Sequence, residues 1–236
     1  MTQNPHPRRA PGTRADITAQ DVIEGAVAVY RAGGLASISM RAVAAVLAVA
    51  PNALYSHVKN KDDLIDGLID ALLGEISLPD PHTDWQEGLF GLMAESRAVL
   101  LKYGDVTSMV LARATRGPNA KRLSESSLEY LHAAGLSGQD AVEALRILLV
   151  YTVGYAAQEY ARLTDPHGEA RMEESRAAFS RGPGLPRTRE AAPHLALHPD
   201  AHTFERGLRW LIQGIAASAV TSSRSASVTS KRTRTR

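Results

Sequence analysis

Residues 39–61 have the sequence SMRAVAAVLAVAPNALYSHVKNK, which contains two short helical patterns in succession. Ser39 is a residue type that commonly caps a helix, and Val43 and Leu47 behind it share one helical face. Pro51 suits the first turn of a second helix, because its missing N–H would have no partner inside that helix. The segment is therefore predicted to form two helices joined by a short turn.

The second helix has one apolar face and one polar face. Leu54 and Val58, four residues apart, can meet Val43 and Leu47 if the helices cross at the large angle of a helix-turn-helix, and small Ala44 permits this close crossing. Short or hydrogen-bonding side chains suited to base edges and phosphates in a major groove occupy the other face: Asn52, Ala53, Tyr55, Ser56 and His57.

Residues 40–66, MRAVAAVLAVAPNALYSHVKNKDDLID, resemble the N-terminal motif of the TetR family of bacterial transcriptional repressors. The LY-x-HV-x-NK ending is the most specific part of this resemblance. Two positions depart from the pattern, since Ala48 stands in the turn where Gly is commoner and Ala50 at the cap where Ser is commoner. An Ala cap leaves one helix N–H without a partner, which costs about 1 kcal/mol.

The resemblance implies a DNA-binding role for the outer face of this helix pair. Arg41 is the best candidate for a bidentate contact to guanine. The implied phosphate contacts are Tyr55, His57, Lys59 and Lys61, and the residues that meet or approach bases are Ser39, Arg41, Pro51, Asn52, Ala53 and Ser56. A merely solvated helix pair is the alternative, against which the clustered Tyr, His and Lys side chains argue.

The composition of the 236 residues limits the class of protein. The absence of Cys excludes a disulfide framework and thiol catalysis and fits a reducing, cytoplasmic setting. No membrane span is expected, because the longest apolar run, Ile147–Ala157, falls short of the roughly 20 residues that a bilayer requires. The N-terminus has charges but no apolar stretch behind them, so no signal peptide is expected. The net charge of +2 is too small by itself to indicate nucleic acid.

Helical periodicity without convincing strand alternation predicts an all-α fold. A first helix should begin at Thr18 and Asp21 and end at Gly33 and Gly34, and Leu35 and Ile38 should fill the core behind the helix pair. Further helices are expected at about 61–76, 84–103, 105–113, 119–134, 137–163 and 204–219, with a charged helical piece at 169–179 inside an otherwise loop-like stretch, 164–202.

Four regions follow from these patterns. Residues 1–16 form a basic arm without acids that is expected to be disordered and either touches DNA or only aids solubility. Residues 17–63 form the helix-turn-helix head, and 64–219 form a helical ligand-binding and dimerisation domain. Residues 220–236 form a Ser/Thr-rich basic tail, also expected to be disordered, that can add phosphate affinity.

Beyond the head, the order DW, RGPNA, AAGLS and FERGLRWLIQGI resembles the C-terminal domain of the tetracycline-repressor subgroup. This implies a homodimer in which the last two long helices pair with their copies as a four-helix bundle, so that two-fold symmetry matches a palindromic operator. The apolar excess in Ala141–Leu163 and Phe204–Ala219 suits such an interface. The alternative is that both helices fill a monomer core.

The same resemblance implies a ligand site at Ser77, Leu92, Ser96, Val110 and Ser127. Val110 falls where the subgroup has a metal-ligating His, and valine cannot coordinate a cation, so magnesium-tetracycline is not the expected ligand. A mostly apolar small-molecule site can also include Met93, Val99, Met109, Tyr151, Thr152 and Tyr155, each of which is equally explained as plain core.

The remaining motifs do not indicate an enzyme, a metal site or a cofactor. His194, His198 and His202 recur every four residues, but Pro193 and Pro199 interrupt a helix through them. There is no Gly-rich phosphate loop, GxSxG or HExxH motif. The prediction is thus a homodimeric repressor released from DNA by an unknown small molecule. Two alternatives remain: a regulator without a small-molecule effector, partner-controlled or an activator, and an enzyme or carrier with a vestigial head.

Overall fold

The computed structural model describes residues 17–113, 116–181, 184–195 and 199–233, of which residues 195 and 220–233 are described by their backbone alone. Within these ranges every regular element is a helix and no strand occurs, which confirms the predicted all-α class. The chain divides into two compact units, residues 1–71 and residues 72–236, here called the head and the body. The expected basic arm at 1–16 lies outside the described residues.

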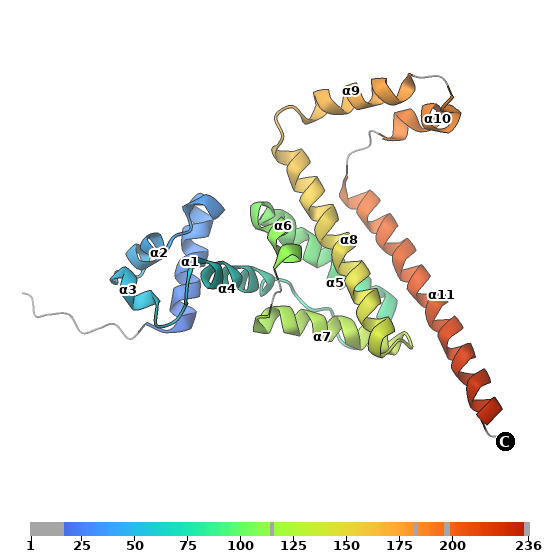
Figure 1. Ribbon diagram of the computed structural model, residues 1–236, viewed down its shortest axis with the longest axis horizontal. Coiled ribbons are helices and arrows are strands. Elements are labelled where there is room, and N and C mark those ends of the chain that lie inside the picture. The colour runs from blue at the N-terminus through green and yellow to red at the C-terminus, as the bar shows by residue number, and fades with distance from the viewer. Residues whose placement is uncertain (1–16, 114–115, 182–183, 196–198, 234–236) are drawn as a thin grey trace, which may run out of the picture. The chain divides into compact units, whose positions relative to one another are not determined.

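The head contains α1 (Ala19–Gly33), α2 (Met40–Val46), α3 (Pro51–Leu54) and most of α4 (Lys61–Leu73) (Figure 1). The predicted start of α1 is confirmed, since the Thr18 hydroxyl accepts from the Asp21 N–H at 3.1 Å and the Asp21 carboxylate accepts from the Thr18 N–H at 2.8 Å. The hydrogen bonds that the Asp21 carboxylate accepts from the Thr18 N–H and the Thr18 hydroxyl lower the pKa of Asp21. Gly34, with φ of 67°, ends the helix as expected.

The predicted apolar faces of the helix-turn-helix form the core of the head. Val43, Leu54 and Val58 are buried, as is Ile38. Gly25 of α1 lets the helices approach closely, because a Cβ there would lie 3.2 Å from side-chain atoms of Val43 and Leu47. The second helix is shorter than expected: α3 ends at Leu54, and residues 55–57 form turns in which the Leu54 carbonyl accepts from the N–H groups of residues 57 and 58.

The two compact units meet within α4, after residue 71. The first part of α4 packs tightly against α1 through Gly67, because a Cβ there would come within 2.3 Å of Ile23. The helix ends at Leu73, three residues before the expected end, because Gly74 follows it.

The body contains α5 (Trp85–Lys102), α6 (Gly104–Ala112), α7 (Pro118–Ala133), α8 (Gly138–Thr164), α9 (Gly168–Ser180), α10 (Pro186–Leu195) and α11 (Ala201–Thr233). α5 packs against α6, α7, α8 and α11, and α8 packs against α6, α7 and α11. α9 and α10 pack against each other beyond the ends of α8 and α11 (Figure 1). Among the described helices, none is both long enough and apolar enough to cross a membrane.

Two segments differ from the sequence-based expectation. Residues 186–195 form α10 instead of a loop: Pro186 suits its first turn, and Pro193 lies inside the helix, where it removes one helical hydrogen bond without ending the helix. α11 continues to Thr233 instead of ending near Ala219, because residues 215–233 contain neither Gly nor Pro.

Ala48 provides a test of backbone strain in the head. It follows the C-cap of α2 with φ of 54°, the left-handed region in which a Cβ is unfavourable. We expect Ala48→Gly to raise the free energy of unfolding by about 1 kcal/mol in urea denaturation. Ala28→Gly, at an exposed position inside α1, should instead lower it by about 1 kcal/mol. Changes of the same sign in both variants would contradict the strain at Ala48.

Candidate functional site

The side chains predicted to contact DNA lie in and around α2, α3 and the start of α4. Ser39, Ala53 and His57 are half-buried. The others are exposed: Arg41, Pro51, Asn52, Tyr55, Ser56, Lys59 and Lys61. The head thus presents hydrogen-bond donors, an aromatic hydroxyl and cationic groups from neighbouring segments, as contact with phosphates and base edges requires.

Local hydrogen bonds fix the backbone that carries these side chains. The Ser39 hydroxyl accepts from the Ala42 N–H at 3.1 Å and caps α2. At the start of α4, the Asn60 side chain accepts from the Asp63 N–H at 2.9 Å, while the Asp63 carboxylate accepts from the Lys59 N–H at 3.0 Å. This reciprocal pair holds the turn between Lys59 and Lys61, so both ammonium groups project from an ordered backbone.

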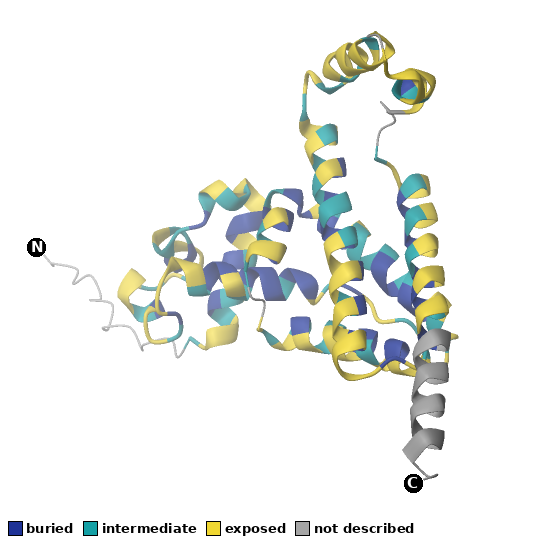
Figure 2. Ribbon diagram, turned by 45° about the vertical axis from the view of Figure 1, so that its right-hand side comes forward, coloured by how far each residue is buried: buried dark blue, intermediate teal, exposed yellow. Residues whose placement is uncertain are grey.

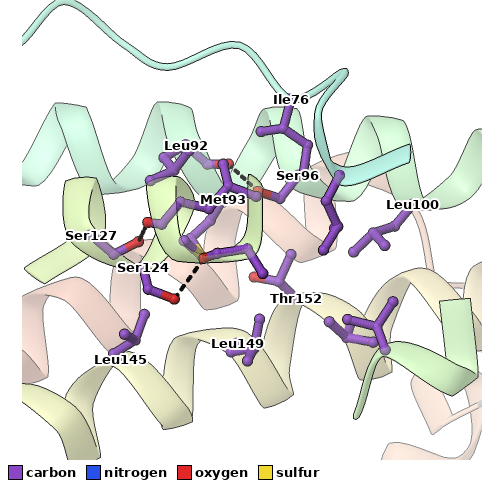
Figure 3. A pocket seen from close by; sticks show the side chains of 15 residues that line it. Ile76, Leu92, Met93, Ser96, Leu100, Ser124, Ser127, Leu145, Leu149 and Thr152 are labelled. Carbon is purple, nitrogen blue, oxygen red and sulfur yellow. Dashed lines mark hydrogen bonds between the residues drawn. The ribbon is translucent and has the colours of Figure 1, made fainter. Parts of the chain in front are cut away.

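The body contains a partly open cavity of about 90 Å³ (Figure 3). α5, α6, α7 and α8 line it, together with Leu73 at the end of α4 and Ile76 just beyond it. Most of the lining is aliphatic, and among the described lining residues no side chain is ionisable. The apolar lining with a few polar groups is the usual character of a small-molecule site.

Four hydroxyl groups provide the polarity of this cavity: Ser96, Ser124, Ser127 and Thr152. Each serine donates to the carbonyl four residues earlier in its own helix, at 2.6 Å, 2.9 Å and 2.8 Å respectively. The Thr152 hydroxyl differs, since its residue is only 1% exposed and the hydroxyl has no hydrogen-bond partner among the described residues.

The chain that leaves α4 is held by two cavity-lining helices. From the end of α5, the Lys102 ammonium and the Tyr103 hydroxyl donate to the Glu75 carboxylate at 2.7 Å and 2.5 Å, and this bond raises the pKa of Lys102. From α7, the Arg122 guanidinium donates to the Ile76 carbonyl at 2.9 Å. We call Glu75, Ile76, Lys102, Tyr103 and Arg122 the α4 clamp.

Comparison with known protein families identifies both units. Residues 22–68 match the family model described as "Bacterial regulatory proteins, tetR family", and residues 78–219 match the model described as "Tetracyclin repressor-like, C-terminal domain". The chain belongs to the TetR family. It is accordingly a bacterial-type transcriptional regulator with a helix-turn-helix DNA-binding head, as the sequence motif predicted.

Individual proteins that are similar to this TetR-family chain support the same family assignment. An "HTH-type transcriptional regulator" of Saccharopolyspora erythraea is 32% identical over 219 residues, which span 90% of each chain. The class A tetracycline repressor from transposon 1721 of Escherichia coli is 32% identical, over 83% of this chain and 88% of its own. The crystal structure of ActR from Streptomyces coelicolor, in complex with actinorhodin, superposes with a TM-score of 0.77 at 25% identity, covering 86% of this chain and 97% of ActR.

Within the TetR-family body, the predicted ligand residues fall into two groups. The cavity is lined by Leu92, Met93, Ser96, Val110, Ser127 and Thr152. The other predicted ligand residues do not line this cavity: Ser77, Val99, Met109, Tyr151 and Tyr155. Ser77 is exposed and directly follows Ile76, the last residue after α4 that lines the cavity. Sequence reasoning missed Ile76, Leu100, Leu123, Ser124, Leu145 and Leu149, whose helical spacing indicated only burial.

Tyr151 and Tyr155 anchor α11 rather than lining the cavity. The Tyr151 ring stacks on Phe204 with centroids 5.3 Å apart, and its hydroxyl donates to the Phe204 carbonyl at 2.9 Å. Burial raises the pKa of the Tyr151 hydroxyl, so it remains protonated as this donor. The Tyr155 hydroxyl accepts from the Asp200 N–H at 3.2 Å. Both rings therefore face α11. The periodicity of α8 alone did not indicate this contact.

The three histidines do not share a helix. His194 lies in α10 and His202 in α11, while His198 lies outside the described residues. Within the described ranges no group of three potential metal ligands comes together.

A buried ion pair joins α5 to α8 next to the aromatic rings of Tyr151, Tyr155 and Phe204. The Arg97 guanidinium donates to both carboxylate oxygens of Glu159, with Nε–Oε2 at 2.9 Å and Nη2–Oε1 at 2.6 Å, and it also lies over the Phe204 ring. Both side chains are nearly buried, at 12% and 9% exposed. The pair thereby links three helices of the body.

Removing one partner of this pair should strongly destabilise the body. Glu159→Leu leaves a buried guanidinium without its counter-charge, and we expect the free energy of unfolding to fall by about 3–5 kcal/mol in urea denaturation. The double variant Arg97→Met with Glu159→Leu removes both charges and should recover most of the loss. A double variant as unstable as the single one would show that packing, rather than the unpaired charge, is responsible.

Proposed function

We propose that this protein is a homodimeric repressor that binds a palindromic operator through α2 and α3 and is released by a small molecule bound in the body cavity. One observation carries the proposal: α4 is a single helix that begins at Lys61, among the predicted phosphate contacts, and ends at Leu73, which lines the cavity. A change at the cavity end of a continuous helix moves its other end, because helices are stiff elements.

The α4 clamp supports this coupling. α5 and α7 both line the cavity and both hold the chain at the end of α4, through Glu75 and the Ile76 carbonyl. A ligand that displaces either helix therefore shifts the end of α4. In a dimer, such a shift changes the separation of the two recognition elements, and operator affinity falls by the ligand's differential affinity for the two conformations.

Exposed apolar side chains on α8 and α11 support a dimer. Ile147 and Val150 of α8 are 53% and 51% exposed, and Trp210 of α11 is 64% exposed. Exposed residues recur along α8 (Figure 2). Such an unpaired apolar surface on two long neighbouring helices suits a four-helix bundle made with a second copy.

A regulator without a small-molecule effector is the second candidate. The cavity volume favours it, because about 90 Å³ is below the roughly 150 Å³ of an engineered cavity that holds benzene. The Thr152 hydroxyl favours the ligand-responsive function, since it is buried in the lining and has no hydrogen-bond partner among the described residues.

Operator binding can be tested by selecting bound sequences from random DNA and titrating the enriched palindrome against salt. We expect Lys61→Ala to weaken binding to all sequences and to reduce the salt slope by about 1, as loss of one phosphate contact does. Arg41→Ala should also relax the preference at one base pair, by roughly 1–3 kcal/mol.

Lys121→Ala, which removes an exposed ammonium group in α7, is the matched control for charge. It should leave both affinity and salt slope unchanged. An unchanged slope in the Lys61 variant, or an equal loss in the Lys121 variant, would contradict the phosphate role of Lys61.

The dimer interface can be tested by introducing a charge on α8. We expect Ile147→Asp to produce a folded monomer in sedimentation measurements, because a buried unpaired carboxylate opposes association. Leu111→Asp, at an exposed apolar position of α6, should remain dimeric. A dimeric Ile147 variant would place the interface on another surface.

A further inference from the structure

We propose that Thr152 is the specificity-determining residue of the body cavity, and that the ligand is a neutral, mostly apolar molecule with one hydroxyl or carbonyl group that pairs with it. This inference rests on the proposed function, because it takes the cavity as the ligand site. Figure 3 shows Thr152 extending from α8 toward the α5 residues Met93 and Ser96.

The hydroxyl groups of the cavity differ in what they offer a ligand. The protons of Ser96, Ser124 and Ser127 are already donated to backbone carbonyls, so these groups present mainly acceptor lone pairs. The Thr152 hydroxyl is buried, and no described residue pairs with either its proton or its lone pairs. It can therefore donate to a ligand carbonyl or exchange both kinds of bond with a ligand hydroxyl. A buried polar group gains most from such a partner, because water does not compete for it.

The absence of charge from the lining selects against charged ligands. Among the described lining residues none is ionisable, so a carboxylate or ammonium group would lose its hydration without gaining a counter-charge. Arg97 and Glu159 do not line the cavity, and each satisfies the other. The cavity therefore distinguishes neutral from charged molecules of the same shape.

The small cavity volume implies that the ligand enlarges it. Met93 is the side chain best suited to move, because an unbranched thioether changes rotamer more easily than the surrounding leucines. Leu149, at 41% exposed, marks a side of the cavity that is close to solvent. Enlargement lowers the affinity of probes of nearly equal size by similar amounts, so comparison between such probes isolates the polar contact.

The test uses three probes that share one ring system: naphthalene, 1-naphthol and 1-naphthoate, each titrated by fluorescence into the full-length chain. We expect 1-naphthol to bind more tightly than naphthalene, and 1-naphthoate at least about 100-fold more weakly than 1-naphthol, because its charge would be unpaired. Thr152→Val, which removes the hydroxyl and no protein hydrogen bond, should weaken 1-naphthol binding about fivefold, the effect of one hydrogen bond. Naphthalene binding should change less than twofold.

Thr107→Val is the matched control. Thr107 is also 1% exposed, but its hydroxyl donates to the Leu100 carbonyl and it does not line the cavity. This variant should retain the preference for 1-naphthol, with folding of both variants verified by circular dichroism.

Three outcomes would overturn the inference: 1-naphthoate binding as tightly as 1-naphthol, an unchanged preference in Thr152→Val, or no binding of any probe. Operator binding by the same preparations separates this failure from that of the proposed function. Probe binding with the wrong preference, in a protein that still binds its operator and is released by a probe, would refute the role of Thr152 alone. Absence of operator binding would refute the repressor itself.

Discussion

The hydrogen bonds at the end of α4 are the constraint on which the rest of the body depends. Glu75 accepts from Lys102 and Tyr103 at one side, and the Ile76 carbonyl accepts from Arg122 of α7 at the other. The same helices line the cavity, which is why the proposed function couples its width to the position of the α4 end. The ion pair between Arg97 and Glu159 holds α5 to α8, the helix on the other side of the cavity.

The head could be predicted in detail because its signals are local. A cap residue, a proline at a first turn and apolar residues four apart each act within one helix, and the structure places Ser39, Pro51 and Leu54 as these rules require. The error lay at the end of α3, where turns with helix-like hydrogen bonds bury Val58 just as a longer helix would. Periodicity alone does not distinguish the two.

The body could be predicted only in part, because its site is assembled from distant segments. Periodicity indicated that Tyr151, Thr152 and Tyr155 are not exposed to solvent, but it did not indicate which neighbour each faces. α11 arrives about 50 residues later and covers both tyrosines through Phe204, whereas Thr152 faces α5 and the cavity. Ser124 was missed for the same reason, since its contribution depends on how α7 is rotated against α8. The α4 clamp joins residues 27 to 46 positions apart, beyond any local pattern.

The small size of the cavity bears directly on how a ligand could act. A ligand that binds both conformations equally shifts nothing, however tightly it binds. If the conformation with the narrow cavity is the one that holds the operator, a ligand too large for it binds the widened conformation almost exclusively. The differential affinity is then set by the work of separating α5 and α7, which in the proposed function is the displacement that reaches α4 through the α4 clamp. A narrow, uncharged cavity is thus compatible with strong regulation. Because a ligand fits only after the cavity has widened, every ligand-bound molecule is in the widened conformation.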